Sequence, residues 1–340
     1  MKAVQIVKPN ELKIIDMEKP VIDSGNNVLI KMTASGICGS DVGIYHGTNA
    51  AATYPRVIGH EIVGRVEEVG AGVTKVKPGD RVIVDQVVSC GNCYACRHGR
   101  GNVCGNLQVR GVHIDGGYRE FIAVPESACY ILPDSLSDVD AVMIEPTTIA
   151  IQSCSRAQLV KEDILLILGC GALGSTILKI ARLSGAKIIV ADVVDAKLEE
   201  ALANGADFAV NLAKEDINKK IRELTEGYGV TVSIDAACTK DSLGTLLEVT
   251  GNAGRVVTMG FSIAPTEVTQ FKITSKELDV RGSRLQNKKF GEAIQLILDG
   301  KLDLNGAVSH TFNFKDAQKA FDFTDTKDPS IRKIVLTFEE

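Results

Sequence analysis

The spacing of apolar residues changes near residue 147 and divides the chain into two halves. Before it, short apolar and alternating runs lie between glycine and proline turns, which predicts strands at 28–32, 62–69 and 81–84. After it, apolar strands alternate with helical segments, beginning with a strand at 164–168 and a helix at 172–183. Strict alternation of strand and helix predicts a parallel, doubly wound sheet, so the expected fold class is α/β with a β-rich first half.

The second half continues the same alternation, with strands expected at 187–191, 209–211, 232–235 and 255–259 and a helix at 197–204. A further helix is expected at 287–299 and a last strand at 333–338. A chain of 340 residues exceeds the size at which one hydrophobic core stops growing, so two domains are expected. Because a lone strand after a wound sheet most simply returns to the first half, we expect one domain at 1–147 with 286–340 and the other at 148–285.

Charge and hydropathy exclude some classes of function. Lysine and arginine number 38 against 43 acidic residues, giving a net charge of −5, so nothing favours binding to nucleic acid. No apolar run approaches the roughly 20 residues of a membrane span, and Met1 to Gln5 lead directly into an alternating pattern without a secretory signal. We therefore expect a cytoplasmic protein with reduced thiols and no membrane contact.

Four cysteines lie close together in the first half, with the spacing Cys-x2-Cys-x2-Cys-x7-Cys: Cys90, Cys93, Cys96 and Cys104. Four thiolates can surround one tetrahedral zinc ion and leave no position open, which makes such a site structural. Disulfides would require an oxidising compartment, and an iron-sulfur cluster is the main alternative metal group. The surrounding residues are polar and rich in glycine, as expected of a surface lobe folded around a metal.

A glycine-rich loop directly follows the strand at 164–168 and opens a helix: Gly169, Cys170, Gly171, Ala172, Leu173 and Gly174. This context is typical of dinucleotide binding, with the pyrophosphate at the helix N-terminus. Asp192 ends the next strand, where a carboxylate can accept hydrogen bonds from ribose hydroxyls and repel a 2′-phosphate. That position favours NAD over NADP, although Asp192 could instead cap the following helix.

Residues 34–70, the cysteine cluster and the glycine loop together resemble the medium-chain zinc-dependent alcohol dehydrogenase family, in its polyol and sugar-acid branch. The resemblance implies a GroES-like catalytic domain with a four-cysteine zinc lobe, and a Rossmann-type domain that binds NAD. It also implies a second, catalytic zinc held by Cys38, His60 and Glu145, with Glu61 able to move on or off the metal. Glu145 stands where alcohol dehydrogenase has a second cysteine, as in sorbitol and threonine dehydrogenases.

The resemblance further implies a mechanism. Zinc would lower the pKa of a substrate hydroxyl, whose carbon then delivers hydride to the nicotinamide. Ser40 matches the family position that passes the proton outward. Related enzymes often have a histidine three residues later, where this chain has Gly43, so the proton would leave through ribose and water or through His46.

Within the branch, the segments 54–61, 111–117 and 282–284 look most like sugar-acid dehydrogenases of the gulonate and galactonate type. A sugar acid needs a cation for its carboxylate, and the candidates are Arg284 and His113, followed by Arg110. His113 could instead order its own turn, and Arg284 could contact the cofactor or close an ion pair. The alternatives are a polyol or L-threonine substrate, a zinc-free reductase and a zinc-binding regulatory module without turnover. The family usually forms dimers or tetramers, so a homo-oligomer is expected.

Overall fold

The computed structural model describes residues 1–22, 25–326, 328 and 330–338, and it contains two compact units. One unit comprises Met1–Pro146 with Phe290–Glu340, and the other comprises Thr147–Lys289. The sequence analysis had placed Thr147 and residues 286–289 with the first domain. Within the described residues, no helix combines the length and apolar character needed to cross a membrane.

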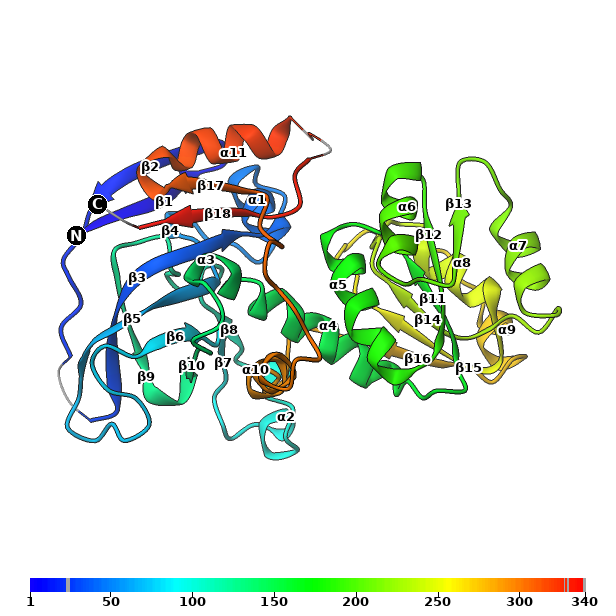
Figure 1. The fold of residues 1–340 in the computed structure, drawn as a ribbon, viewed down its shortest axis with the longest axis horizontal. Helices are drawn as coiled ribbons and strands as arrows, with labels where there is room; N and C mark the ends of the chain where they lie inside the picture. Colours follow the sequence, from blue (N-terminus) through cyan, green and yellow to red (C-terminus); the bar gives the residue numbers. More distant parts are fainter. Residues whose placement is uncertain (23–24, 327, 329, 339–340) are drawn as a thin grey trace. The chain divides into compact units, whose positions relative to one another are not determined.

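The first unit is built mainly from antiparallel strands (Figure 1). A small sheet has the order β2-β1-β4, and a larger one the order β10-β6-β5-β3-β18-β17 with β9 also paired to β3. Their bounds are β1 Lys2–Lys8, β2 Glu11–Asp16, β3 Asn27–Ile37, β4 Arg56–Val57, β5 Glu61–Val69, β6 Arg81–Val84, β9 Phe121–Pro125, β10 Cys129–Ile131, β17 His310–Asn313 and β18 Ile334–Thr337. The core consists of the inward-facing aliphatic residues of these strands, including Ile30, Met32, Ile62 and Ile83.

Strand β18 returns from the far end of the chain to the first unit, as the sequence predicted. It pairs antiparallel with β3, with Ile334 opposite Ile37 and Leu336 opposite Ser35 (Figure 1). Helix α11 (Ala317–Asp325) packs on β17 and β18. The pairing carries the residues that precede β18 to the end of β3, and this proximity becomes important for the site described below.

Short helices connect the strands of the first unit: α1 Gly39–Tyr45, α2 Tyr94–Arg97, α3 Asp138–Ala141 and α10 Phe290–Leu298. Strands β7 (Val87–Val88) and β8 (Gln108–Val109) pair antiparallel and close a lobe that contains α2 and the 3₁₀ turn Gly101–Val103. We call residues 89–107 the cysteine lobe.

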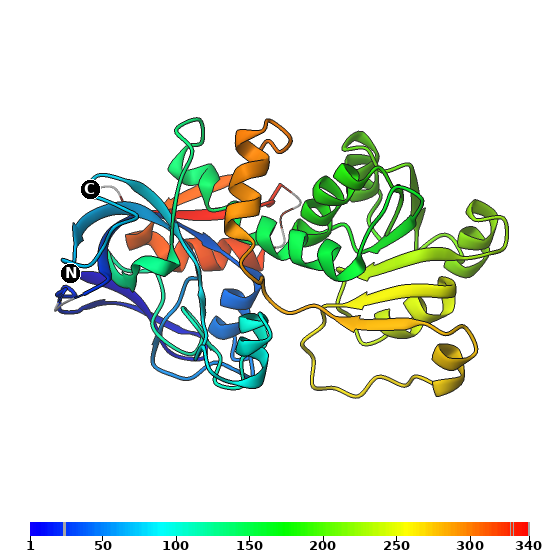
Figure 2. The ribbon, with the colours of Figure 1, turned by 90° about the horizontal axis from the view of Figure 1, so that it is seen from below.

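The second unit is a parallel sheet of the order β13-β12-β11-β14-β15-β16. Its strands are β11 Ile164–Leu168, β12 Lys187–Asp192, β13 Phe208–Asn211, β14 Val230–Asp235, β15 Thr250–Thr258 and β16 Asp279–Gly282. Helices lie on both sides of the sheet (Figures 1 and 2), with the bounds α4 Ile144–Ala157, α5 Ala172–Ala181, α6 Asp195–Ala203, α7 Ile217–Leu224, α8 Ser242–Val249 and α9 Gln270–Thr274. The order confirms the predicted doubly wound fold, with the strand order reversing between β11 and β14.

One face of this sheet is sealed by an apolar cluster. Strand residues Leu166, Ile189 and Val256 pack with Ile221 of α7 and Leu246 of α8. Parallel strands are buried on both faces, which is why these segments show continuous apolar runs in the sequence.

Candidate functional site

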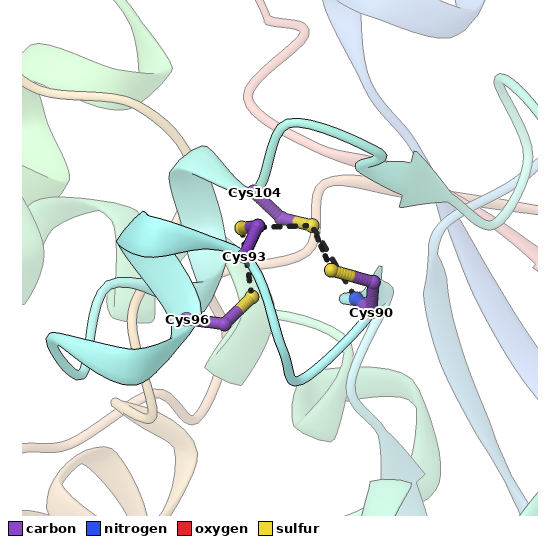
Figure 3. A group of neighbouring side chains, drawn as sticks. All are labelled: Cys90, Cys93, Cys96 and Cys104. Atoms are coloured by element: carbon purple, nitrogen blue, oxygen red, sulfur yellow. Dashed lines mark hydrogen bonds between the residues drawn. The ribbon is translucent and has the colours of Figure 1, made fainter.

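Four cysteine side chains converge within the cysteine lobe (Figure 3). Sγ of Cys93 lies 3.5 Å from Sγ of Cys96 and 3.8 Å from Sγ of Cys104, which is 3.4 Å from Sγ of Cys90. Sulfurs on a tetrahedral zinc with bonds of about 2.3 Å stand about 3.8 Å apart, whereas a disulfide requires about 2.05 Å. The spacing fits a closed metal site made of four thiolates.

The backbone of the lobe stabilises some of these sulfurs as thiolates, whereas burial raises the pKa of Cys96 to about 11. The N–H of Asn106 donates to Sγ of Cys104 at 3.3 Å. Hydrogen bonds from the backbone of Cys96 and Gly105 lower the pKa of Cys93 to about 6. Because the thiolate is the form that binds a metal, the lobe is prepared for a cation by its own backbone.

A second group of donors lies at the end of β3 and the start of β5. Cys38, His60 and Glu61 each present one ligand atom, and these atoms lie within 4.8 Å of one another. The strand register explains the grouping, because β3 and β5 are antiparallel with Gly36 opposite Glu61. A thiolate, an imidazole and a carboxylate form a donor set suited to zinc.

Asp41 organises two members of this group. Its fully buried carboxylate accepts a hydrogen bond from the N–H of Cys38 at 2.9 Å and lies 3.3 Å from Nδ1 of His60. Burial lowers the pKa of His60, but the charges of Asp41 and Cys38 outweigh burial and leave that pKa well above its usual value. A carboxylate behind a ligand histidine fixes the orientation of the ring and makes it a more basic ligand.

Lys333 is a member of this site that the sequence analysis missed. It directly precedes β18, is buried, and donates from Nζ to Oε1 of Glu61. Oε2 of Glu61 is buried and has no hydrogen-bond partner among the described residues, as expected of an oxygen available to a cation. The expected return of the last strand was the one sequence signal that could have brought Lys333 to Glu61.

Glu145, the second residue of α4, is also buried, and the charges of His60 and Glu61 act on its carboxyl group. Burial raises the pKa of Glu145 to about 7, and His60 lowers it while Glu61 raises it. Nε2 of Gln86 donates to Oε1 of Glu145 at 2.5 Å. Glu145 lies outside the tight cluster of Cys38, His60 and Glu61, and Gln86 fixes one of its oxygens.

The two proton-relay candidates lie in different surroundings. Oγ of Ser40 is 3.5 Å from Nε2 of His60, so Ser40 lies beside the donor group. His46 makes hydrogen bonds to Oδ1 of Asn10 at 2.9 Å and to Oδ1 of Asp325 at 2.8 Å. These contacts link α1 to the chain's first turn and to α11.

The three cation candidates for the substrate have distinct environments. His113 accepts a hydrogen bond at Nδ1 from the N–H of Val109 at 3.1 Å, within its own turn. Arg284, after β16 in the second unit, places its guanidinium 5.0 Å from the ring centre of Phe261. Arg110 is buried, only 6% exposed, and directly follows β8.

The glycine loop of the second unit has the geometry of a phosphate site. Gly169 has φ +98°, which favours glycine, and a Cβ at Gly174 would overlap the carbonyl oxygen of Gly169. A Cβ at Gly171 would have no atom of the described residues within 4 Å, so open space adjoins the N-terminus of α5. Leu173 lies half-buried in the first turn. A helix N-terminus with open space before its amides is suited to an anion.

Asp192 holds this loop from the end of β12. Oδ2 accepts from the N–H of Cys170 at 2.7 Å, and Oδ1 accepts from the N–H of Val193 at 2.8 Å. Oδ1 also accepts from the N–H of Val194 at 3.1 Å, so the carboxylate orders the backbone on both sides, and Oδ2 keeps a second lone pair for another donor.

Comparison with known proteins agrees with this architecture. Residues 24–134 match the alcohol dehydrogenase GroES-like domain, and residues 172–299 match the family described as zinc-binding dehydrogenase. The first match contains Cys38, His60, Glu61 and the cysteine lobe, and the second begins within the glycine loop at residue 172.

Three similar proteins illustrate the range of the family. The chain is 41% identical to the starvation-sensing protein RspB of Escherichia coli over the full length of both, and a solved RspB structure complexed with the cofactor NADH superimposes with a TM-score of 0.93 over 99% of each chain. L-threonine 3-dehydrogenase of Anaeromyxobacter sp. is 35% identical over 95% of each. L-idonate 5-dehydrogenase of E. coli is 26% identical, with a TM-score of 0.87 over 99% of this chain and 98% of that one.

Proposed function

The chain belongs to the medium-chain zinc-dependent alcohol dehydrogenase family, and on that premise we propose that it oxidises a secondary alcohol of a sugar acid, a hexonate of the gulonate or galactonate type, with NAD. The observation that carries the proposal is the convergence of Cys38, His60 and Glu61 at the end of β3. Similarity to L-idonate 5-dehydrogenase and to the NADH complex of RspB supports the substrate class and the cofactor.

We assign the inner group, Cys38, His60, Glu61 and Glu145, to a catalytic zinc and the four cysteines of the lobe to a structural zinc. When bound, the catalytic zinc supplies a Lewis acid that lowers the pKa of the substrate hydroxyl, and NAD supplies the hydride acceptor. The cysteine lobe uses all four thiolates and leaves no position for a substrate, so the reaction belongs to the inner group.

The residues around the metal ligands would transfer the proton of the substrate hydroxyl and balance the charge of Glu61. Ser40, which lies beside His60, is placed to accept the proton from the substrate hydroxyl. With Gly43 in place of a histidine, the proton would leave by way of the cofactor ribose and water, or by way of His46. Lys333 balances the charge of Glu61 when that carboxylate is not bound to the metal.

We propose that the loop of Gly169, Gly171, Leu173 and Gly174 binds the pyrophosphate of NAD. Asp192 would accept from the ribose hydroxyls and disfavour a 2′-phosphate. The support is the open space at Gly171 and the position of Asp192 at the end of β12.

The test is a substrate panel followed by NADH absorbance. The purified enzyme is given aldonic acids, the matching neutral polyols and L-threonine, with NAD and then NADP. We expect turnover of at least one hexonate with NAD. Efficient oxidation of polyols alone would refute the sugar-acid substrate, and oxidation of L-threonine alone would establish the second candidate, which the threonine dehydrogenase relative favours.

A Cys38→Ser variant tests the assignment of the inner metal. The substitution removes a thiolate from the inner group and leaves the cysteine lobe untouched, so we expect turnover to be lost and zinc to fall from two atoms per chain to one. Full activity in this variant would refute the catalytic role of Cys38. A wild-type protein with two zinc atoms and no turnover on any substrate would point instead to a regulatory protein.

We also propose that the enzyme is a cytoplasmic homo-oligomer. Reduced thiolates are required for both zinc groups, which suits a reducing compartment. Exposed apolar side chains lie near the open edge strand β16 of the second unit, including Phe261, Ile263 and Phe271. Light scattering of the purified protein should give a dimer or tetramer mass, and a monomer would refute the assembly.

A further inference from the structure

Arg110 lies directly across a strand pair from Gln86. Strands β7 and β8 pair Val87 with Val109, and the pairing continues one residue further, where the N–H of Arg110 donates to the carbonyl of Gln86 at 3.0 Å. Residues directly opposite each other in an antiparallel pair project from the same face, with Cβ atoms about 4.5–5.5 Å apart. The guanidinium of Arg110 therefore shares a face with the Gln86 side chain.

The guanidinium is buried and incompletely bonded. Arg110 is 6% exposed, and its Nη1 is buried without a hydrogen-bond partner among the described residues. Burial lowers the pKa of Arg110, and the nearby charge of Asp85 opposes that effect. A buried donor without a partner costs free energy, so natural structures retain such groups where an anion or another acceptor binds them.

Gln86 connects Arg110 to the inner metal group through two hydrogen bonds. The Gln86 side chain donates to Glu145, and the acceptor oxygen of the same amide is buried and has no partner in the described chain. Gln86 is thus bonded through its side chain to Glu145 and through its backbone to Arg110. A substrate that carries an anionic group in addition to the hydroxyl at the metal would supply an acceptor for Nη1 of Arg110.

We propose that Arg110 binds the carboxylate of the substrate and thereby selects sugar acids over neutral polyols. The inference rests on the proposed function and names the residue that sets its substrate class. A guanidinium presents two parallel N–H groups that match a carboxylate, which explains a buried arginine at this position. A phosphate would satisfy the same donors, so sugar phosphates are included in the test.

The test compares Arg110→Met, Arg110→Lys and the matched control Arg119→Met. Arg119 is a suitable control because it is a cation of the same unit whose Nε is also buried without a hydrogen-bond partner among the described residues. Burial lowers the pKa of Arg119, and the nearby charge of Arg110 lowers it further, so the control tests the loss of a neighbouring cation. The kcat/KM of each variant is measured with a hexonate, with the polyol of the same carbon skeleton and with the corresponding sugar phosphate. Binding of the hexonate to the NADH-loaded enzyme is measured separately by calorimetry.

We expect Arg110→Met to lower kcat/KM for the hexonate by about 100-fold, mostly through KM, while kcat/KM for the polyol changes little. Arg110→Lys should recover part of the loss, and Arg119→Met should leave the ratio of acid to polyol unchanged. An equal loss on acid and polyol would show that Arg110 is structural and would overturn the proposal. A loss confined to the sugar phosphate would also overturn the carboxylate assignment.

Calorimetry distinguishes a failure of the Arg110 site from a failure of the proposed sugar-acid substrate. If the wild-type enzyme oxidises polyols but no hexonate, the sugar-acid substrate is wrong. Hexonate binding that is equal in the wild type and in Arg110→Met would refute the Arg110 site whether or not hexonates are turned over. Wild-type binding that Arg110→Met weakens by about 100-fold would support it.

Discussion

At the scale of single residues, the buried ion pair of Lys333 and Glu61 leads to a prediction about folding stability. Both side chains are buried, and Lys333 is the cation in contact with Glu61. Removing one partner of a buried ion pair typically costs about 3–5 kcal/mol, because the other charge is left uncompensated. We therefore expect Lys333→Met to lower the free energy of unfolding of the zinc-free protein by about that amount, measured by urea titration after chelation.

Zinc should restore part of the stability lost in this variant, since a metal on Glu61 replaces the missing cation. The double variant Lys333→Met, Glu61→Gln is the control, and it should be more stable without zinc than Lys333→Met alone. Equal stability of the zinc-free wild type and Lys333→Met would contradict the role assigned to the pair.

The residues of the site differ in whether the sequence alone could predict them. Cys38, His60 and Glu61 lie in segments that a family resemblance covers, so they could be proposed directly. Lys333 is 272 residues from Glu61 in the chain, and only the pairing of β18 with β3 brings the two together. Arg110 was the third cation candidate, and its burial and its hydrogen bond to Gln86 depend on tertiary structure.

At the scale of elements, two glycines of one loop are expected to have different roles, Gly174 in folding stability and Gly171 in cofactor binding. A side chain at Gly174 would overlap the backbone of Gly169, whereas one at Gly171 would enter open space. We expect Gly174→Ala to cost about 1–3 kcal/mol of folding free energy, as overpacking does, and Gly171→Val to cost little. Gly171→Val should instead weaken NADH binding by roughly tenfold or more, which is about 1.4 kcal/mol.

Thermal unfolding and NADH fluorescence titration measure the two effects independently. The two variants serve as controls for each other because they lie in the same loop. Unchanged NADH affinity in Gly171→Val would contradict the proposed approach of the pyrophosphate to this residue.

Element types were easier to predict than element ends. The strand expected at 164–168 coincides with β11, because a buried parallel strand gives a continuous apolar run. The helix expected at 172–183 ends at Ala181 and continues as the 3₁₀ turn Arg182–Ser184 before Gly185 at φ +77°. A left-handed glycine ends a helix by backbone geometry, which apolar periodicity does not record.

At the scale of the whole molecule, the sequence predicted two domains and the return of the last strand from the change in periodicity. It did not indicate how the cysteine lobe joins the inner metal group. The β7–β8 pair closes the lobe, and the residue before β7 is Gln86, which holds Glu145. A continuous path of backbone and one hydrogen bond therefore connects the two metal groups within the first unit.

This connection leads to a prediction for removal of the structural metal. We expect the double variant Cys93→Ser, Cys96→Ser to retain one zinc per chain by elemental analysis and to lose hydrogen-exchange protection in the cysteine lobe, because the lobe has little apolar core of its own. If disorder reaches β7, Gln86 no longer holds Glu145, and the remaining zinc should be released to a chelator faster than from the wild type.

Cys238→Ser, which removes an exposed thiol of the second unit, is the control and should match the wild type. A double variant that keeps two zinc atoms would refute the structural site, and faster exchange in the lobe with unchanged zinc release would refute the coupling through Gln86.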